Sequence, residues 1–180
     1  METKKIVLAG MFAAMTIVGA FIRIPIGSVP FTLQIFFVIF AGVLLGSKLG
    51  FLSQLVYMII GLAGLPVFSQ GGGLSYIFNP TFGYIIGFCV AAFVSGFISE
   101  RLLIKKISFM RFFISSFIGL VSCYIIAVPY MYLIFNFVAG EARALLPLII
   151  GGFIVFLPLD LVKIIFVSML SVKIYPVVRG

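Results

Sequence analysis

The stretch LLPLIIGGFIVFLPLDLVKIIFVSML, from Leu145 to Leu170, is apolar over a length that can cross a membrane, yet it holds two opposite charges, Asp160 and Lys163. An ionised group at the centre of a bilayer costs about 2.5–3.5 kcal/mol on insertion scales, so charges at this depth are rare and mostly functional. Residues three apart lie on one helix face. Asp160 and Lys163 are therefore candidate ligand-binding residues. The alternative is a self-neutralising ion pair that only fixes helix packing.

The composition of the whole chain indicates an integral membrane protein. Of 180 residues, 64% are hydrophobic and 9% are charged, whereas a typical soluble domain has about 25% charged residues. At about 20 residues a span, this length allows roughly six helices, and the apolar segments lack the alternation of a β-barrel. We expect an all-α fold with one domain, residues 1–180. Its six spans are expected at Ile6–Ile24, Phe31–Leu45, Phe51–Leu65, Thr81–Ile98, Phe112–Phe135 and Leu145–Leu170.

The distribution of lysine and arginine predicts the orientation of these spans. With a cytoplasmic N-terminus, the external segments contain only Arg23 and Arg143, and the cytoplasmic segments contain Lys4, Lys5, Lys48, Arg101, Lys105, Lys106, Arg111, Lys173 and Arg179. This bias follows the positive-inside rule. It predicts a multi-pass protein of the bacterial cytoplasmic membrane with both termini in the cytoplasm. The net charge of +8 is thus a topology signal, and nucleic-acid binding is not expected.

Few residues could carry catalysis. The chain has no histidine, and its four acidic residues form no obvious pair, which disfavours acid–base hydrolysis and histidine-based metal or nucleophilic sites. The stretch nearest to an ATPase phosphate loop, Gly42–Lys48, lacks the required order. We expect neither an enzyme nor a cofactor, and any transport energy must come from an ion gradient or a partner. Cys89 and Cys123 fall inside spans and are interpreted as small core residues.

Several polar residues outside the charged pair could face a ligand. The segment Pro66–Pro80, expected outside the membrane, combines a glycine run with the amides of Gln70 and Asn79. Such a loop suits a lid over a small amphiphilic molecule; the alternative is a mobile surface loop. Gln34, early in the second span, could line the same cavity or bond to a neighbouring helix.

The first span carries two small-residue pairs at a spacing of four, Ala9 with Ala13 and Gly10 with Ala14. Small residues at this spacing allow another helix to approach closely. The pattern fits packing inside this bundle and docking of a second protein equally well.

Four motifs occur in order along these spans: VPFTLQ (Val29–Gln34), GLPVF (Gly64–Phe68), NPTFGY (Asn79–Tyr84) and FLPLDLVK (Phe156–Lys163). With them the chain resembles the BioY family, the biotin-specific substrate-binding (S) components of energy-coupling factor transporters. The resemblance implies an outward-opening biotin site covered by the first and third loops. It also implies three partner subunits, one membrane coupling subunit and two cytoplasmic ATPases, with Ala9 and Ala13 as the docking pair.

The resemblance further implies that Asp160 and Lys163 hold biotin. The carboxylate can accept from the ureido N–H groups, and the ammonium can donate to the ureido carbonyl or pair with the ligand carboxylate; aromatic residues such as Tyr84 would pack the body. Relatives often place an asparagine among the loop glycines, where this chain has Gln70 followed by three glycines. In this chain the contact that the asparagine amide makes with biotin passes to Gln70 or Asn79, or is missing. The alternative function is a stand-alone, gradient-driven carrier that uses the Asp160–Lys163 pair.

Overall fold

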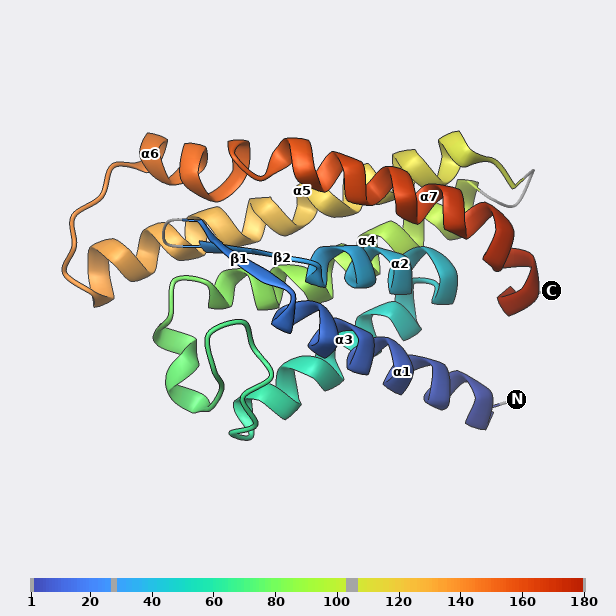
Figure 1. Ribbon diagram of the computed structural model, residues 1–180, viewed down its shortest axis with the longest axis horizontal. Helices are drawn as coiled ribbons and strands as arrows, with labels where there is room; N and C mark the ends of the chain where they lie inside the picture. The colour runs from blue at the N-terminus through green and yellow to red at the C-terminus, as the bar shows by residue number, and fades with distance from the viewer. Residues whose placement is uncertain (1, 27–28, 103–106, 180) are drawn as a thin grey trace.

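The computed structural model describes residues 2–26, 29–102 and 107–179, and these are mostly helical. The long helices run roughly along the long axis of the molecule, and a short β-hairpin lies alongside them (Figure 1). The elements in order are α1 (Glu2–Phe21), β1 (Arg23–Ile26), β2 (Val29–Thr32), α2 (Gln34–Leu45), α3 (Ser47–Leu62), the 3₁₀ helix η1 (Leu74–Phe78), α4 (Phe82–Leu102), α5 (Phe109–Leu133), the π-helix η2 (Ile134–Val138), α6 (Leu145–Ile149), the π-helix η3 (Ile150–Ile154) and α7 (Leu157–Arg179).

The hairpin corrects the expectation of a purely α-helical chain. β1 and β2 pair antiparallel, with Arg23 opposite Thr32 and Ile26 opposite Val29. The residue before a proline is pushed towards extended conformations, and two prolines, Pro25 and Pro30, stand opposite each other in this ladder. The first predicted span therefore ends earlier than expected, and the second begins at the end of the hairpin.

Helix lengths divide the bundle into two groups. Among the described residues, four helical stretches are long and apolar enough to cross a membrane, namely Thr3–Phe21, Phe82–Leu102, Phe109–Val138 and Leu145–Val178. α2 and α3 have 12 and 16 residues, which correspond to about 18 and 24 Å of helix, less than the roughly 30 Å of a hydrocarbon core. The connection between the second and third expected spans, residues 46–50, shrinks to Gly46 itself, whose φ of 85° ends α2. Lys48 therefore belongs to α3.

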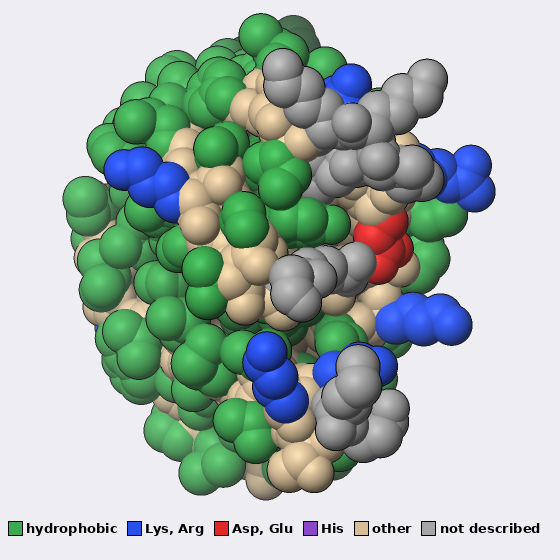
Figure 2. All heavy atoms as spheres, turned by 90° about the vertical axis from the view of Figure 1, so that its right-hand side faces the viewer, with side chains coloured by type: hydrophobic (Ala, Val, Ile, Leu, Met, Phe, Trp, Pro, Cys, Tyr) green, Lys and Arg blue, Asp and Glu red, His purple; other side chains and the backbone are tan. Residues whose placement is uncertain are grey.

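Both chain ends lie at the same end of the molecule (Figure 1). Several lysine and arginine side chains lie among hydrophobic ones on that end (Figure 2). Several helices begin or end at this end of the molecule. Their exposed basic residues are Lys4, Lys5, Lys48, Arg101 and Lys173. This clustering agrees with the charge bias in the sequence; Lys105 and Lys106 lie outside the described residues.

Close helix contacts depend on glycines at the centre of the bundle. A side chain at Gly42 of α2 would place its Cβ 2.1 Å from the hydroxyl oxygen of Ser95 and 2.4 Å from the carbonyl oxygen of Ala92 in α4. Gly10 of α1, by contrast, is exposed, with no heavy atom within 4 Å of that position.

We expect Gly42→Ala to lower the stability of the protein in detergent, because α2 and α4 must separate to admit the methyl group. Overpacking of this kind costs about 1–3 kcal/mol, or roughly 3–10 °C in melting temperature for a chain of this size. Gly10→Ala is the matched control and should leave the melting temperature unchanged or slightly raised. Equal melting temperatures for the two variants would contradict the close α2–α4 contact.

Candidate ligand-binding cavity

A cavity of about 550 Å³, including its opening, lies between the hairpin and helices α2, α4, α5 and α7. Its wall is apolar and aromatic over most of its extent, with a few polar groups. The lining residues are Val29, Pro30, Phe31, Thr32, Gln34, Ile35, Ser69, Thr81, Tyr84, Ile85, Phe88, Cys123, Tyr124, Phe156, Asp160 and Lys163. Small-molecule sites typically have this make-up, an apolar wall with a few well-placed polar groups.

The predicted charged pair forms part of this wall. The ammonium nitrogen of Lys163 lies 2.7 Å from Oδ1 of Asp160, and the two residues are only 6% and 3% exposed. The second carboxylate oxygen, Oδ2, accepts a hydrogen bond from the hydroxyl of Tyr124 in α5. Asp160 also lies in the first turn of α7, where the helix dipole favours a negative charge. Both oxygens of the buried carboxylate thus have partners within the protein.

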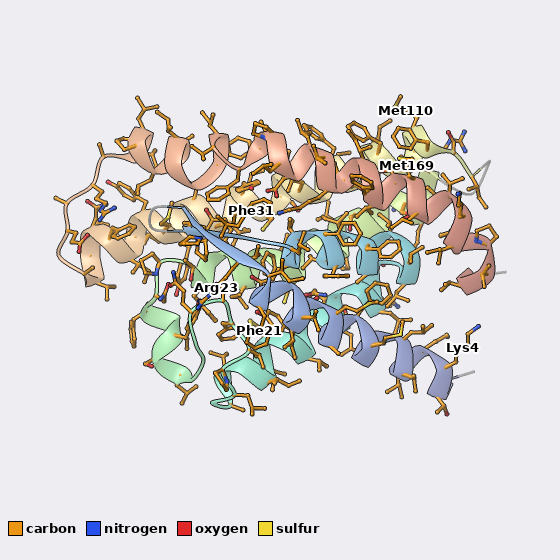
Figure 3. The ribbon with its side chains drawn as sticks, in the orientation of Figure 1. Lys4, Phe21, Arg23, Phe31, Met110 and Met169 are labelled. Carbon is orange, nitrogen blue, oxygen red and sulfur yellow. The ribbon has the colours of Figure 1, made fainter. Side chains whose placement is uncertain are left out.

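Lys163 reaches the hairpin as well as Asp160. Its ammonium group donates to the backbone carbonyl of Thr32 at 2.6 Å and lies 3.8 Å from the centre of the Phe31 ring, a cation–π contact. The Phe31 ring also stacks on Phe156, with centroids 6.5 Å apart, and Figure 3 shows Phe31 beneath α7. Lys163 therefore holds the end of the hairpin against the final helix.

The irregular start of the last span shapes the cavity wall. η3 is a π-helical segment, and α7 begins after it with Pro158 in its first turn, a position where proline is tolerated. π-helical turns often occur at functional sites. The hydroxyl of Tyr84 in α4 donates to the carbonyl of Gly152 at 2.6 Å, so the predicted residue Tyr84 lines the cavity and also holds η3 in place.

Gln34 lies on the wall, as one of its two predicted roles requires, but its amide is already engaged. It donates to the hydroxyl of Tyr57 at 2.6 Å, and its oxygen accepts from the hydroxyl of Thr32 at 3.0 Å. Tyr57 in turn donates to the carbonyl of Val67 at 3.2 Å. The chain of hydrogen bonds links the hairpin, α2, α3 and the loop after α3.

The two loop amides lie away from the cavity lining. Asn79 donates to the side-chain oxygen of Gln70 at 3.1 Å, and Gln70 is exposed. The side-chain oxygen of Asn79 accepts from the backbone and hydroxyl of Thr81, and Thr81 itself lines the cavity. The structure thus brings Asp160, Lys163, Gln34 and Tyr84 together and leaves Gln70 and Asn79 at the rim.

The small residues of α1 divide between two faces. Ala9 and Ala13 are 3% and 2% exposed and face the bundle, whereas Gly10 and Ala14 are exposed. In this conformation Ala9 and Ala13 pack within the chain, and the second pair is open to a neighbour.

Sequence reasoning missed two partners of the charged pair. Tyr124 carried a signal, because a tyrosine hydroxyl in the middle of an apolar span needs a partner when it is buried, and Asp160 is an acceptor in a neighbouring span. The Thr32 carbonyl carried no such signal, since every residue has a backbone carbonyl group. Cys89 and Cys123 are buried free thiols, as expected, although Cys123 also lines the cavity.

Comparisons with known proteins identify the family of the chain. The BioY family model matches residues 1–180. The probable biotin transporter BioY of Lysinibacillus sphaericus is 45% identical over 99% of this chain and 90% of its own length. The biotin transporter BioY of Thermotoga maritima is 37% identical over 95% of both chains.

A solved structure shares the fold. It is the crystal structure of the S-component for biotin from an ECF-type ABC transporter, which is 26% identical and has a TM-score of 0.85, with 99% of this chain and 93% of that chain covered. The full-length family match and these relatives establish that the chain belongs to the BioY family.

Proposed function

We propose that this protein is the biotin-binding component of an energy-coupling factor transporter, and that Asp160 and Lys163 bind the ureido ring of biotin. The observation that carries the proposal is a buried carboxylate–ammonium pair on the wall of an otherwise apolar cavity. Membership of the family and the names of the relatives support biotin as the ligand.

The lining complements the chemistry of biotin. The ureido group offers two N–H donors and one carbonyl acceptor, which match an acidic and a basic side chain, respectively. The bicyclic ring and aliphatic chain of biotin match the apolar wall, where Phe31, Phe88 and Phe156 supply aromatic surface. Gln34 and Tyr84 complete the polar part of the site; Gln70 and Asn79, at the rim, would contribute only after a movement of the loop.

Uptake against a gradient needs partners that supply energy. An unchanged binding site only equilibrates its ligand across a membrane. The proposal therefore includes a membrane coupling subunit and two cytoplasmic ATPase subunits, and it is supported by the structural relative, which is an S-component from an ECF-type ABC transporter. The first helix is the proposed docking element, with its small residues Ala9 and Ala13, or the exposed pair beside them, in contact with the coupling subunit.

The proposed arrangement in the membrane has six crossings, with both termini in the cytoplasm. The short helices α2 and α3 would cross where the bilayer thins locally around them. The shared end of the termini and the cations gathered there support it (Figures 1 and 2). The hairpin and the loop after α3 would then face the outside, where biotin arrives.

We expect Asp160→Asn and Lys163→Ala each to weaken biotin binding at least about tenfold, a loss of about 1.4 kcal/mol, because each removes one of the groups that read the ureido ring. Isothermal titration calorimetry on the purified protein in detergent measures the effect. Glu141→Gln is the control, since it disrupts the exposed Glu141–Arg143 ion pair (2.6 Å) and should leave the affinity unchanged.

The same variants distinguish binding from packing. If the pair only stabilised the fold, both variants would lower the melting temperature without biotin while the folded protein kept its wild-type affinity. That outcome would contradict the proposed role.

The orientation predicts a labelling pattern for single cysteines in a variant without Cys89 and Cys123. A membrane-impermeant maleimide should label Ala142→Cys, in the exposed link before α6, on intact cells. It should label Lys173→Cys, near the end of α7, only after the cells are permeabilised. The reverse pattern would place the termini outside.

A further inference from the structure

Arg23 contacts two residues of the cavity lining but is not required for the ureido interaction proposed above. β1 pairs it with Thr32, and its Nη1 donates to the backbone carbonyl of Ser69; both Thr32 and Ser69 belong to the cavity lining. Figure 3 shows Arg23 at the start of the hairpin, beside the loop that follows α3. The guanidinium group of Arg23 therefore lies next to the cavity wall, and Arg23 is exposed.

The charges inside the cavity already balance. Among the described lining residues, Asp160 and Lys163 are the ones with a formal charge, and they neutralise each other at 2.7 Å. Lys163 already contacts Asp160, the Thr32 carbonyl and the Phe31 ring. A negatively charged ligand that enters this cavity brings a charge that the interior does not offset.

Biotin brings such a charge at one end only. Its carboxyl group is ionised at neutral pH, because carboxyl pKa values lie near 4, and its ureido ring is neutral. Placing the carboxylate beside Asp160 would bring like charges together in an apolar environment, which is unfavourable. The neutral ring therefore suits the interior, and the charged end suits the rim.

Arginine is the side chain best suited to receive that end. Its planar guanidinium has five N–H donors in a fork that matches both oxygens of a carboxylate, and such charge-assisted pairs are stronger than neutral hydrogen bonds. The contact with Ser69 uses Nη1, which is one of the three nitrogens of the guanidinium group.

We propose that Arg23 binds the carboxylate of biotin at the mouth of the cavity, so that the ligand lies with its ureido ring towards Asp160 and Lys163 and its acid end outward. Arg23 would thereby select the free acid over neutral esters and amides. This inference rests on the proposed function. Because Arg23 already links the hairpin to the loop after α3, the same contact would hold both segments over the bound ligand.

The test compares biotin with biotin methyl ester, which keeps the ring and chain but lacks the charge. Wild-type protein should bind the acid at least about tenfold more tightly than the ester. Arg23→Gln should lose about tenfold in affinity for the acid and little for the ester, so that the preference disappears. Arg143→Gln is the matched control, because it removes one positive charge from a residue paired with Glu141 and should preserve the preference.

Other outcomes overturn the inference in distinguishable ways. An equal loss for acid and ester in Arg23→Gln would identify Arg23 as a structural link between hairpin and loop and nothing more. Equal wild-type affinities for acid and ester would exclude carboxylate recognition, even if Arg23→Gln did not fold. Failure of the wild-type protein to bind either ligand would instead refute the proposed function itself.

Discussion

Two charges buried among apolar side chains must be neutralised and fully hydrogen-bonded, and much of the site follows from that requirement. Removing one partner from a buried ion pair costs about 3–5 kcal/mol, because the other charge is left without compensation. Here the compensation comes from three parts of the chain. α7 supplies Asp160 and Lys163, α5 supplies the Tyr124 hydroxyl, and the hairpin supplies the Thr32 carbonyl and the Phe31 ring.

This network makes the hairpin part of the proposed binding site. A ligand that engages Lys163 competes with the Thr32 carbonyl and the Phe31 ring for the same ammonium group, so binding and the position of the hairpin are coupled. The Gln34–Tyr57–Val67 chain and the Arg23–Ser69 contact extend the coupling to the loop after α3. The two segments that would cover the ligand are thus tied to each other and to the charged pair.

The sequence predicted the parts of this arrangement that depend on residue type. Long apolar runs indicated membrane helices, because apolar side chains are strongly favoured in a bilayer. Two opposite charges in one such run indicated a candidate ligand site, because moving a charge into a bilayer costs much free energy. The hairpin was missed because hydropathy separates spans from connections but does not show how a connection pairs, although Pro25 and Pro30 favour extended neighbours. The Thr32 carbonyl could not be foreseen, since a backbone group has no signature in the sequence. For Gln70 and Asn79 the residue type indicated ligand binding, but two amides in one loop can bond to each other as readily as to a ligand.

A structure of the protein with bound biotin tests the central claim most directly. The account predicts the ureido ring inside the cavity, with its N–H groups and carbonyl within about 3.2 Å of the Asp160 carboxylate and the Lys163 ammonium, the range of an ordinary hydrogen bond. Biotin bound at another place, with Asp160 and Lys163 still bonded only to each other, Tyr124 and Thr32, would contradict it.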